Sequence, residues 1–189
     1  KSVFISAPHA MTWALNQDQN WTQGKNQDAI NFFQNVLKID LAKSEQRYTA
    51  TQSGNSIQYS IKDFNFNGIV GDVIGDAISG RANTSFANHT FWTDIIRPKT
   101  GSKSTPIFTA DNLAANIVGI RFESDAKGRL VFLTCPIEAF NSMITRQMVL
   151  ERSFNWLLDG KIEKPKKPLI SSTVNSLLFQ DVVTGKTKS

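Results

Sequence analysis

Residues 118–160 read VGIRFESDAKGRLVFLTCPIEAFNSMITRQMVLERSFNWLLDG and carry the strongest structural signals in the chain. Two apolar runs, NIVGIRFES at 116–124 and RLVFLT at 129–134, flank the turn sequence Asp-Ala-Lys-Gly. Glycine adopts a positive φ at little cost, so we assign the special turn conformation to Gly128. The pattern predicts a β-hairpin.

An amphipathic helix is expected directly after this hairpin. Its sequence, SMITRQMVLERSFNWLLDG, ends at Gly160, a residue typical of a helix C-terminal cap. The expected buried stripe consists of Met143, Leu150, Phe154, Leu157 and Leu158.

The first part of the chain supplies further elements. The apolar run SVFIS at 2–6 predicts a buried strand, and residues 26–41 predict a second amphipathic helix. Strands are expected at 47–51 and 57–61, followed by a Gly- and Asp-rich loop through residue 80. The buried face of the second helix is expected to hold Ile30, Phe33 and Leu37, with Ala29 and Val36 alongside. Together these elements indicate an α/β layered domain.

Composition sets limits on the partners of the chain. Its 189 residues are 40% hydrophobic, an ordinary globular value, and no run is long and apolar enough to span a membrane. Most of the net charge of +5 lies after Gly160, in a Lys- and Pro-rich segment that indicates a solvated linker rather than a nucleic-acid surface. We therefore divide the chain into a domain at 1–160, a linker at 161–168 and a tail at 169–189.

Part of the sequence resembles a known family. The run LVFLTCPIEAF, followed by Arg146 and Trp156-Leu157, resembles the end of class I glutamine-amidotransferase-like domains of multidomain secreted and surface bacterial proteins. The opening SVFISAPHAMTWAL, followed by the Phe-rich helix expected at 26–41, is similar to the middle strand of those domains and the helix after it. The resemblance implies a three-layer, flavodoxin-like sheet with an extended tail, in an extracellular, cell-surface or periplasmic protein. In the tail, Leu178-Phe179, Val182-Val183 and Gly185 are similar to the opening of an ASH-type immunoglobulin-like domain.

The chain departs from this family at both catalytic positions. Active members carry a Cys on a sharp turn flanked by glycines, whereas the matching residues 5–9 are Ile-Ser-Ala-Pro-His. Active members also carry His-Pro-Glu after the last core strand, where this chain has Cys135-Pro136-Ile137-Glu138. The resemblance thus implies a non-catalytic relative without a cofactor, serving structure or interaction.

The resemblance also implies that the sheet is incomplete in this chain. Domains of this family begin with strand-helix units before their middle strand, and exposed edges of central strands promote aggregation. We expect neighbouring domains of the parent protein, or other chains, to complete the sheet.

Two alternatives stay open from the residues alone. The first is a hydrolase of the amidotransferase-like group that acts on peptide or carbohydrate, through a nucleophile, a base and an acid. Its candidate residues are Ser6, His9, His89, Cys135 and Glu138. The second is a carbohydrate-binding surface formed by the loop tryptophans Trp13, Trp21 and Trp92.

Residues 63–74 imitate the start of a calcium loop. The run Asp-Phe-Asn-Phe-Asn-Gly alternates oxygen-bearing side chains before a glycine, as EF-hand loops do. The twelfth position, however, is Ile74 instead of the required carboxylate. The segment therefore predicts a polar turn, and no metal site is expected.

Overall fold

The structure is a computed structural model that describes residues 2–8, 10–11, 27–41, 60–61, 63–83, 85–86, 89–90 and 93–159. The expected strand at 47–51, the linker at 161–168 and the tail at 169–189 lie outside the described residues. The three loop tryptophans lie outside them as well.

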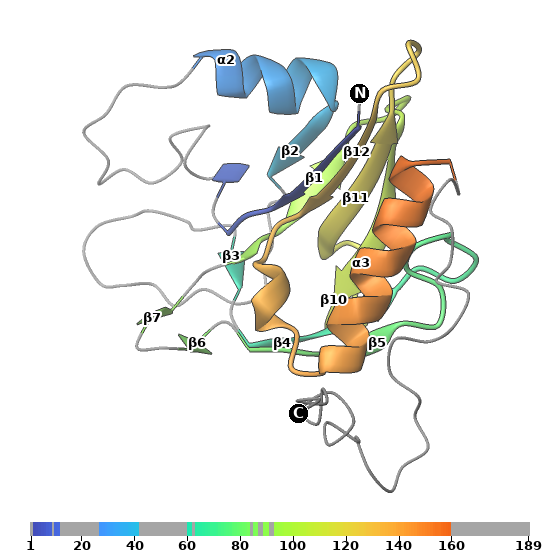
Figure 1. Ribbon diagram of the computed structural model, residues 1–189. Coiled ribbons are helices and arrows are strands. Elements are labelled where there is room, and N and C mark those ends of the chain that lie inside the picture. The colour runs from blue at the N-terminus through green and yellow to red at the C-terminus, as the bar shows by residue number, and fades with distance from the viewer. Residues whose placement is uncertain are drawn as a thin grey trace, which may run out of the picture.

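The described residues form a mixed α/β structure (Figure 1). Its helical elements are α2 (Gln27–Ile30), the π-helix η1 (Asn31–Val36), the short 3-10 helix η2 (Ile137–Ala139) and α3 (Met143–Leu157). Its strands are β1 (Ser2–Ser6), β2 (Ile39–Leu41), β3 (Ser60–Ile61), β4 (Phe64–Gly68), β5 (Ser79–Ala82), β6 (Ser85–Phe86), β7 (His89–Thr90), β8 (Thr93–Asp94), β9 (Ile96–Pro98), β10 (Ser104–Ala110), β11 (Ile117–Glu123) and β12 (Arg129–Leu133).

Eight of the described strands form one sheet, in the order β1-β12-β11-β10-β4-β5, with β9 paired to β11 and to β2. Strand β1 runs parallel to β12, and the other pairings in this sheet are antiparallel. Strand β1 therefore stands at the end of the strand order.

The predicted hairpin is confirmed as β11 and β12, in which Gly119 faces Leu133 and Glu123 faces Arg129. The turn differs in one detail, because the positive φ of 61° falls on Lys127 and not on Gly128. The turn closes through hydrogen bonds between Ser124 and Gly128, in which the backbone N–H of each residue takes part. These two hydrogen bonds hold Ser124 and Gly128 together across the turn, and the residue with the positive φ lies between them.

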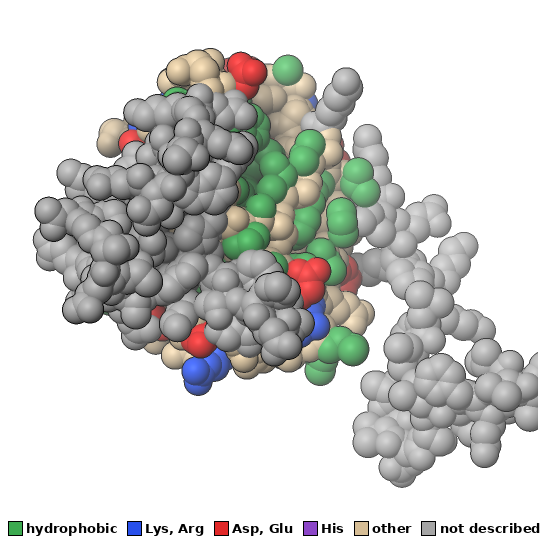
Figure 2. Space-filling view, turned by 90° about the vertical axis from the view of Figure 1, so that its left-hand side faces the viewer, with side chains coloured by type: hydrophobic (Ala, Val, Ile, Leu, Met, Phe, Trp, Pro, Cys, Tyr) green, Lys and Arg blue, Asp and Glu red, His purple; other side chains and the backbone are tan. Residues whose placement is uncertain are grey.

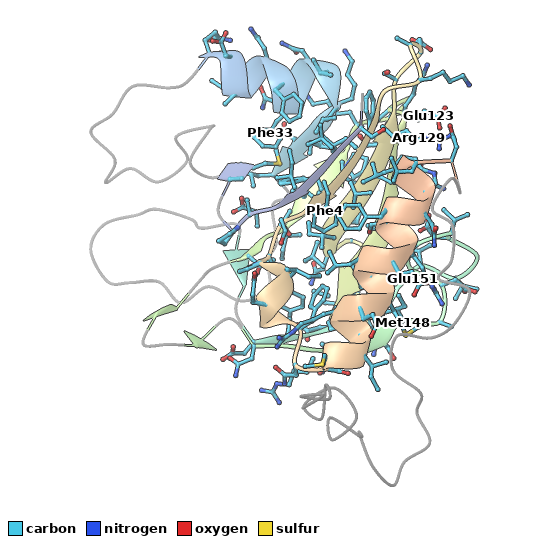
Figure 3. All side chains as sticks on the ribbon, viewed as in Figure 1. Phe4, Phe33, Glu123, Arg129, Met148 and Glu151 are labelled. Atoms are coloured by element: carbon cyan, nitrogen blue, oxygen red, sulfur yellow. The ribbon has the colours of Figure 1, made fainter. Side chains whose placement is uncertain are left out.

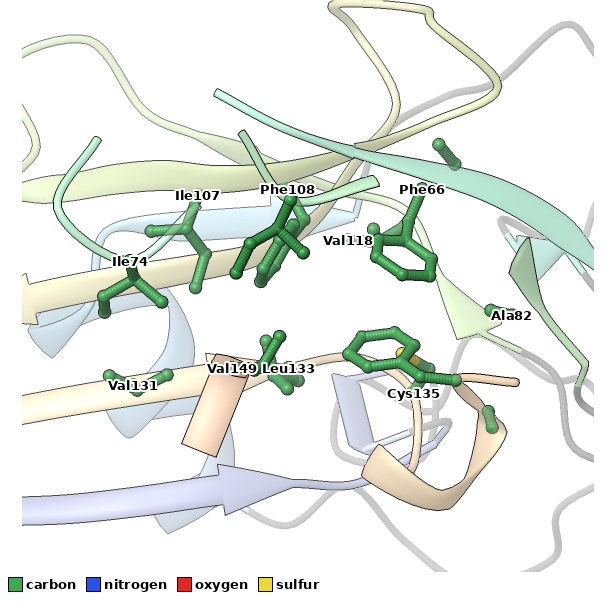
Figure 4. Packing of buried hydrophobic residues seen from close by; sticks show 14 of the residues in the cluster. Phe66, Ile74, Ala82, Ile107, Phe108, Val118, Val131, Leu133, Cys135 and Val149 are labelled. Atoms are coloured by element: carbon green, nitrogen blue, oxygen red, sulfur yellow. The ribbon is translucent and has the colours of Figure 1, made fainter. Parts of the chain in front are cut away.

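Apolar side chains cover both faces of the sheet. On one face, α3 packs over a cluster that includes Phe66 and Phe108 (Figure 4). Phe140 belongs to the same cluster, and its ring stacks on that of Phe66 at 4.3 Å between centroids. On the other face, η1 brings Phe33 against Phe132, with ring centroids 5.4 Å apart. Side chains of β12 alternate between the two clusters, as the two-residue period of a strand requires.

The predicted helix is confirmed as α3, but its expected buried stripe is wrong in most positions, and Leu157 is the expected member that is buried. The buried residues are Val149, Ser153 and Leu157, spaced by four, and the side chain of Ser142 caps the first turn. Three members of the expected stripe are exposed: Met143, Phe154 and Leu158. An apolar face of α3 is thus left on the surface.

The helix expected at 26–41 is described at 27–36, and its last six residues are a π-helix. Phe33 and Leu37 are buried as expected, whereas Val36 is 52% exposed, against expectation. The wider turn of a π-helix changes which side chains share a face, so the 3.6-residue period fails here.

The loop expected at 62–80 is partly wrong, because it contains strand β4 and the first residues of β5. Phe64 and Phe66 point into the core while Asn65 is exposed, an alternation typical of a strand. The backbone after β4 turns back tightly, so a Cβ added to Gly68 would lie 1.7 Å from the carbonyl oxygen of Gly75. Only glycine allows this close approach.

The helices in the described part of the chain are all too short or too polar to cross a lipid bilayer.

Candidate interaction surface

Two of the candidate catalytic residues lie together where β1 and β12 end. The Ser6 hydroxyl donates a hydrogen bond of 2.9 Å to the backbone carbonyl of Cys135. The Cys135 side chain is buried in the cluster under α3, and this burial raises the pKa of its thiol to about 12. At neutral pH the sulfur is therefore a protonated thiol and not a thiolate nucleophile.

The other candidates do not complete a catalytic group among the described side chains. Glu138 is exposed on η2. His9 lies outside the described residues, and His89 belongs to β7 with its side chain outside the description. The described structure thus brings together Ser6 and Cys135, and it holds both in structural roles.

One buried carboxylate is not among the residues expected from the sequence to be functional. Asp94, on β8, is fully buried and accepts a hydrogen bond of 2.9 Å from the backbone N–H of Met11. It thereby anchors the segment that follows β1. The sequence holds one cue to the burial of Asp94, since this residue directly precedes the apolar pair Ile95-Ile96.

The carboxylate of Asp72, in the segment that resembles a calcium loop, is engaged by protein donors. One oxygen accepts the backbone N–H groups of Ile74 and Gly75, at 2.9 and 3.0 Å, and the other accepts from Nε of Arg121 at 2.7 Å. In the part of the chain that the structure describes, no three acidic, His or Cys side chains form a metal-binding group. Asp72 instead shapes its own loop.

Two arginines hold the end of α3 against the sheet. The guanidinium groups of Arg121 and Arg129 lie 5.5 and 5.2 Å from the centre of the Trp156 ring, a cation–π arrangement. Arg129 also pairs with Glu123 at 3.0 Å (Figure 3) and donates to the Trp156 carbonyl. The C-terminal turns of α3 are therefore fixed beside β12 and β1.

Strand β1 has an open edge among the described strands, since β12 is its one partner there. In its parallel register Phe4 faces Val131 and Ser6 faces Leu133, and the backbone N–H of Ala7 bonds to the Leu133 carbonyl at 3.1 Å. Backbone groups alternate in direction along a strand, so Val3 and Ile5 bond toward β12. The N–H and C=O groups of Phe4 and Ser6 consequently point outward.

Apolar side chains flank this open edge on both faces of the sheet. Phe4 packs on the α3 side, with its ring 5.8 Å from that of Phe154, and Ile5 packs on the η1 side. Val3, Phe154 and Leu158 are 48%, 42% and 47% exposed. Figure 2, which views this side of the molecule, shows a band of exposed hydrophobic side chains. We call Val3, Phe4, Ile5, Phe154 and Leu158 the β1 surface.

The described residues of β1 carry none of the sequence features that commonly protect an edge strand. Natural sheets guard their edges with charged side chains, proline or bulges. The sequence SVFIS contains neither a charge nor a proline, and its pairing with β12 runs through five residues without a register shift. Outward backbone groups and apolar side chains together make a site that a further strand can join.

Comparison with known proteins yields no relative. No family model matches the chain, and no curated protein or solved structure is significantly similar to it.

Proposed function

We propose that this chain is a non-catalytic interaction module that binds another polypeptide along the open edge of β1. The observation that carries the proposal is the combination at one edge of outward-pointing backbone groups on Phe4 and Ser6 with apolar side chains on both faces. Binding by strand addition uses these two features, since the backbone gives affinity and the alternate side chains give specificity.

The state of the candidate nucleophiles supports a non-catalytic role. The Cys135 thiol is a poor nucleophile because it is buried and its pKa is raised. The Ser6 hydroxyl donates its hydrogen bond to a backbone carbonyl and not to a catalytic base, so it is a poor nucleophile as well. For this reason we place interaction above hydrolysis.

The resemblance described above suggests a wider setting. We infer that the sheet is the closing part of a three-layer, flavodoxin-like domain of the amidotransferase-like kind. The parallel pairing of β1 with β12 and the apolar clusters on both faces of the sheet favour this assignment. The partner polypeptide would then be a neighbouring domain or chain of an exported, multidomain bacterial protein.

A strand peptide tests the proposed function directly. The probe is a fluorescent peptide with the sequence of residues 128–134, because β12 is a strand whose side chains already fit those of β1. The full chain, held at nanomolar concentration, should bind the peptide and raise its fluorescence anisotropy. Val3→Lys should weaken binding at least tenfold, since it adds a charge to the apolar edge.

A matched control separates this effect from a general effect of lysine. Val36 is 52% exposed, close to the 48% of Val3, but lies on η1. Val36→Lys should therefore leave peptide binding unchanged. Absence of binding by the unaltered chain, or equal loss in the two variants, would remove the basis of the proposal.

A further inference from the structure

The sequence of β1 has a property that the proposed function does not use. Read in either direction, Ser2–Ser6 has the same pattern, namely serine, a β-branched aliphatic residue, phenylalanine, a β-branched aliphatic residue and serine. A strand of this kind complements itself when two copies run antiparallel. The symmetry is centred on Phe4.

We propose that the occupant of the β1 edge is a second copy of this chain, paired antiparallel through β1 about a two-fold axis at Phe4. This inference rests on the proposed function and names its partner. In this register Phe4 faces the other copy's Phe4, Val3 faces its Ile5, and Ser2 faces its Ser6. Such an isologous contact closes on itself and forms a dimer rather than a filament.

The direction of the backbone groups agrees with this register. The outward N–H and C=O groups belong to alternate residues that include Phe4 and Ser6. In an antiparallel ladder, two facing residues whose backbone groups point at each other exchange two N–H···O=C bonds. Phe4 would do so with the other copy's Phe4, and Ser2 with its Ser6, so that the outward groups of these residues are all hydrogen-bonded. Val3 and Ile5 of the other copy then form the closer pair without hydrogen bonds, about 4.5 Å apart at Cα.

The side chains agree as well. Phe4 lies on the α3 side of the sheet against Phe154. A two-fold axis through the sheet places both copies of α3 on the same face, so the exposed Phe154 and Leu158 of each copy flank the central Phe4 pair. Val3 and Ile5 make matching aliphatic contacts on the opposite face.

Cysteine pairing tests the register. Val3→Cys and Ile5→Cys are prepared separately in a Cys135→Ala background, so that each chain carries one thiol. Mixing the two variants under mild oxidation should give a disulfide-linked heterodimer, because a Cα separation of about 4.5 Å permits a disulfide. Either variant alone should link far less, since each residue lies diagonally from its own copy. Val36→Cys mixed with either variant is the control.

Sedimentation velocity measures the oligomeric state of the same proteins as a function of their concentration. The unaltered chain should change from monomer to dimer as its concentration rises, and Val3→Lys should shift this change to at least tenfold higher concentration. A chain that stays monomeric, or links mainly through Val3→Cys with itself, overturns the inference. If the monomer still binds the strand peptide, the proposed function survives without the dimer; if it binds neither, both fail.

Discussion

Replacing Asp72 with alanine should loosen the loop at 69–78, because the Asp72 side chain closes this loop and links it to Arg121 of β11. The carboxylate is almost fully buried and accepts the N–H groups of Ile74 and Gly75 as well as Nε of Arg121. Without the carboxylate, these two buried N–H groups lose their acceptor. Each unsatisfied N–H lowers the free energy of unfolding by about 1–3 kcal/mol, unless a water molecule replaces the acceptor. Arg121 keeps its contact with the Trp156 ring and stays partly exposed to solvent. The loss of its ion pair with Asp72 therefore contributes little to the change in unfolding free energy.

The expected loss for Asp72→Ala is therefore about 3 kcal/mol of unfolding free energy. With a urea m-value of about 2 kcal/mol/M, the midpoint of urea unfolding should fall by about 1.5 M with little change in m. Circular dichroism at 222 nm follows the transition.

A neighbouring carboxylate provides the control. Asp76 is exposed and accepts a single hydrogen bond of 2.9 Å, from the N–H of Gly71, that water can replace. Asp76→Ala should cost less than about 1 kcal/mol. Equal losses for Asp72→Ala and Asp76→Ala, or a loss below about 1 kcal/mol for Asp72→Ala, would refute the reasoning that buried donors depend on Asp72.

Two further perturbations probe the core. The raised pKa of Cys135 keeps its thiol protonated in the folded state above pH 9.0, where the unfolded chain ionises. The folded state thus binds more protons there, and stability should fall by roughly 1 kcal/mol per pH unit from pH 9 toward 12. Urea unfolding of Cys135→Ala should lack this slope; identical slopes in both proteins would contradict the burial of the thiol. Gly68→Ala should cost more than about 3 kcal/mol, because its Cβ would meet the Gly75 carbonyl, whereas Gly80→Ala meets the edge of the Phe66 ring at 3.0 Å and should cost less. Similar urea midpoints for the two variants would contradict the close approach of the Gly68 and Gly75 backbones.

The hairpin and α3 could be predicted because their signals are local. A turn sequence between two alternating runs specifies β11 and β12, and Ser142 accepts the N–H of Thr145 at the start of α3. Which face of α3 is buried is set by the sheet beneath it, and this information is not local. Phe154 and Leu158 satisfy the helical period as well as Val149 does, yet they are exposed.

Strand β4 was missed for a different reason. Its alternation of Phe64 and Phe66 with Asn65 and Asn67 also matches the spacing of calcium ligands. The two patterns share a period of two residues, and what separates them is the buried partner of each phenylalanine. Phe66 stacks on Phe140, more than seventy residues later in the chain, a contact that no local pattern indicates.

The candidate site shows the same division. The short apolar run of β1 predicted a strand, but its expected full burial is wrong, because Ser2 and Val3 are exposed. That edge position follows from the pairing of β1 with β12 alone among the described strands. The buried state of Cys135 also depends on α3 lying above it, and the sequence offered the thiol only as a candidate nucleophile.

Hydrogen exchange at single backbone amides of β1 tests the central claim most directly. At concentrations where the chain sediments as a monomer, the outward amides of Phe4 and Ser6 should exchange at least tenfold faster than that of Ile5, which bonds toward β12. Adding the strand peptide, or raising the chain concentration, should slow exchange at Phe4 and leave Ile5 unchanged. Slow exchange at Phe4 in the dilute monomer, or no slowing under either condition, would contradict an open edge that binds polypeptide.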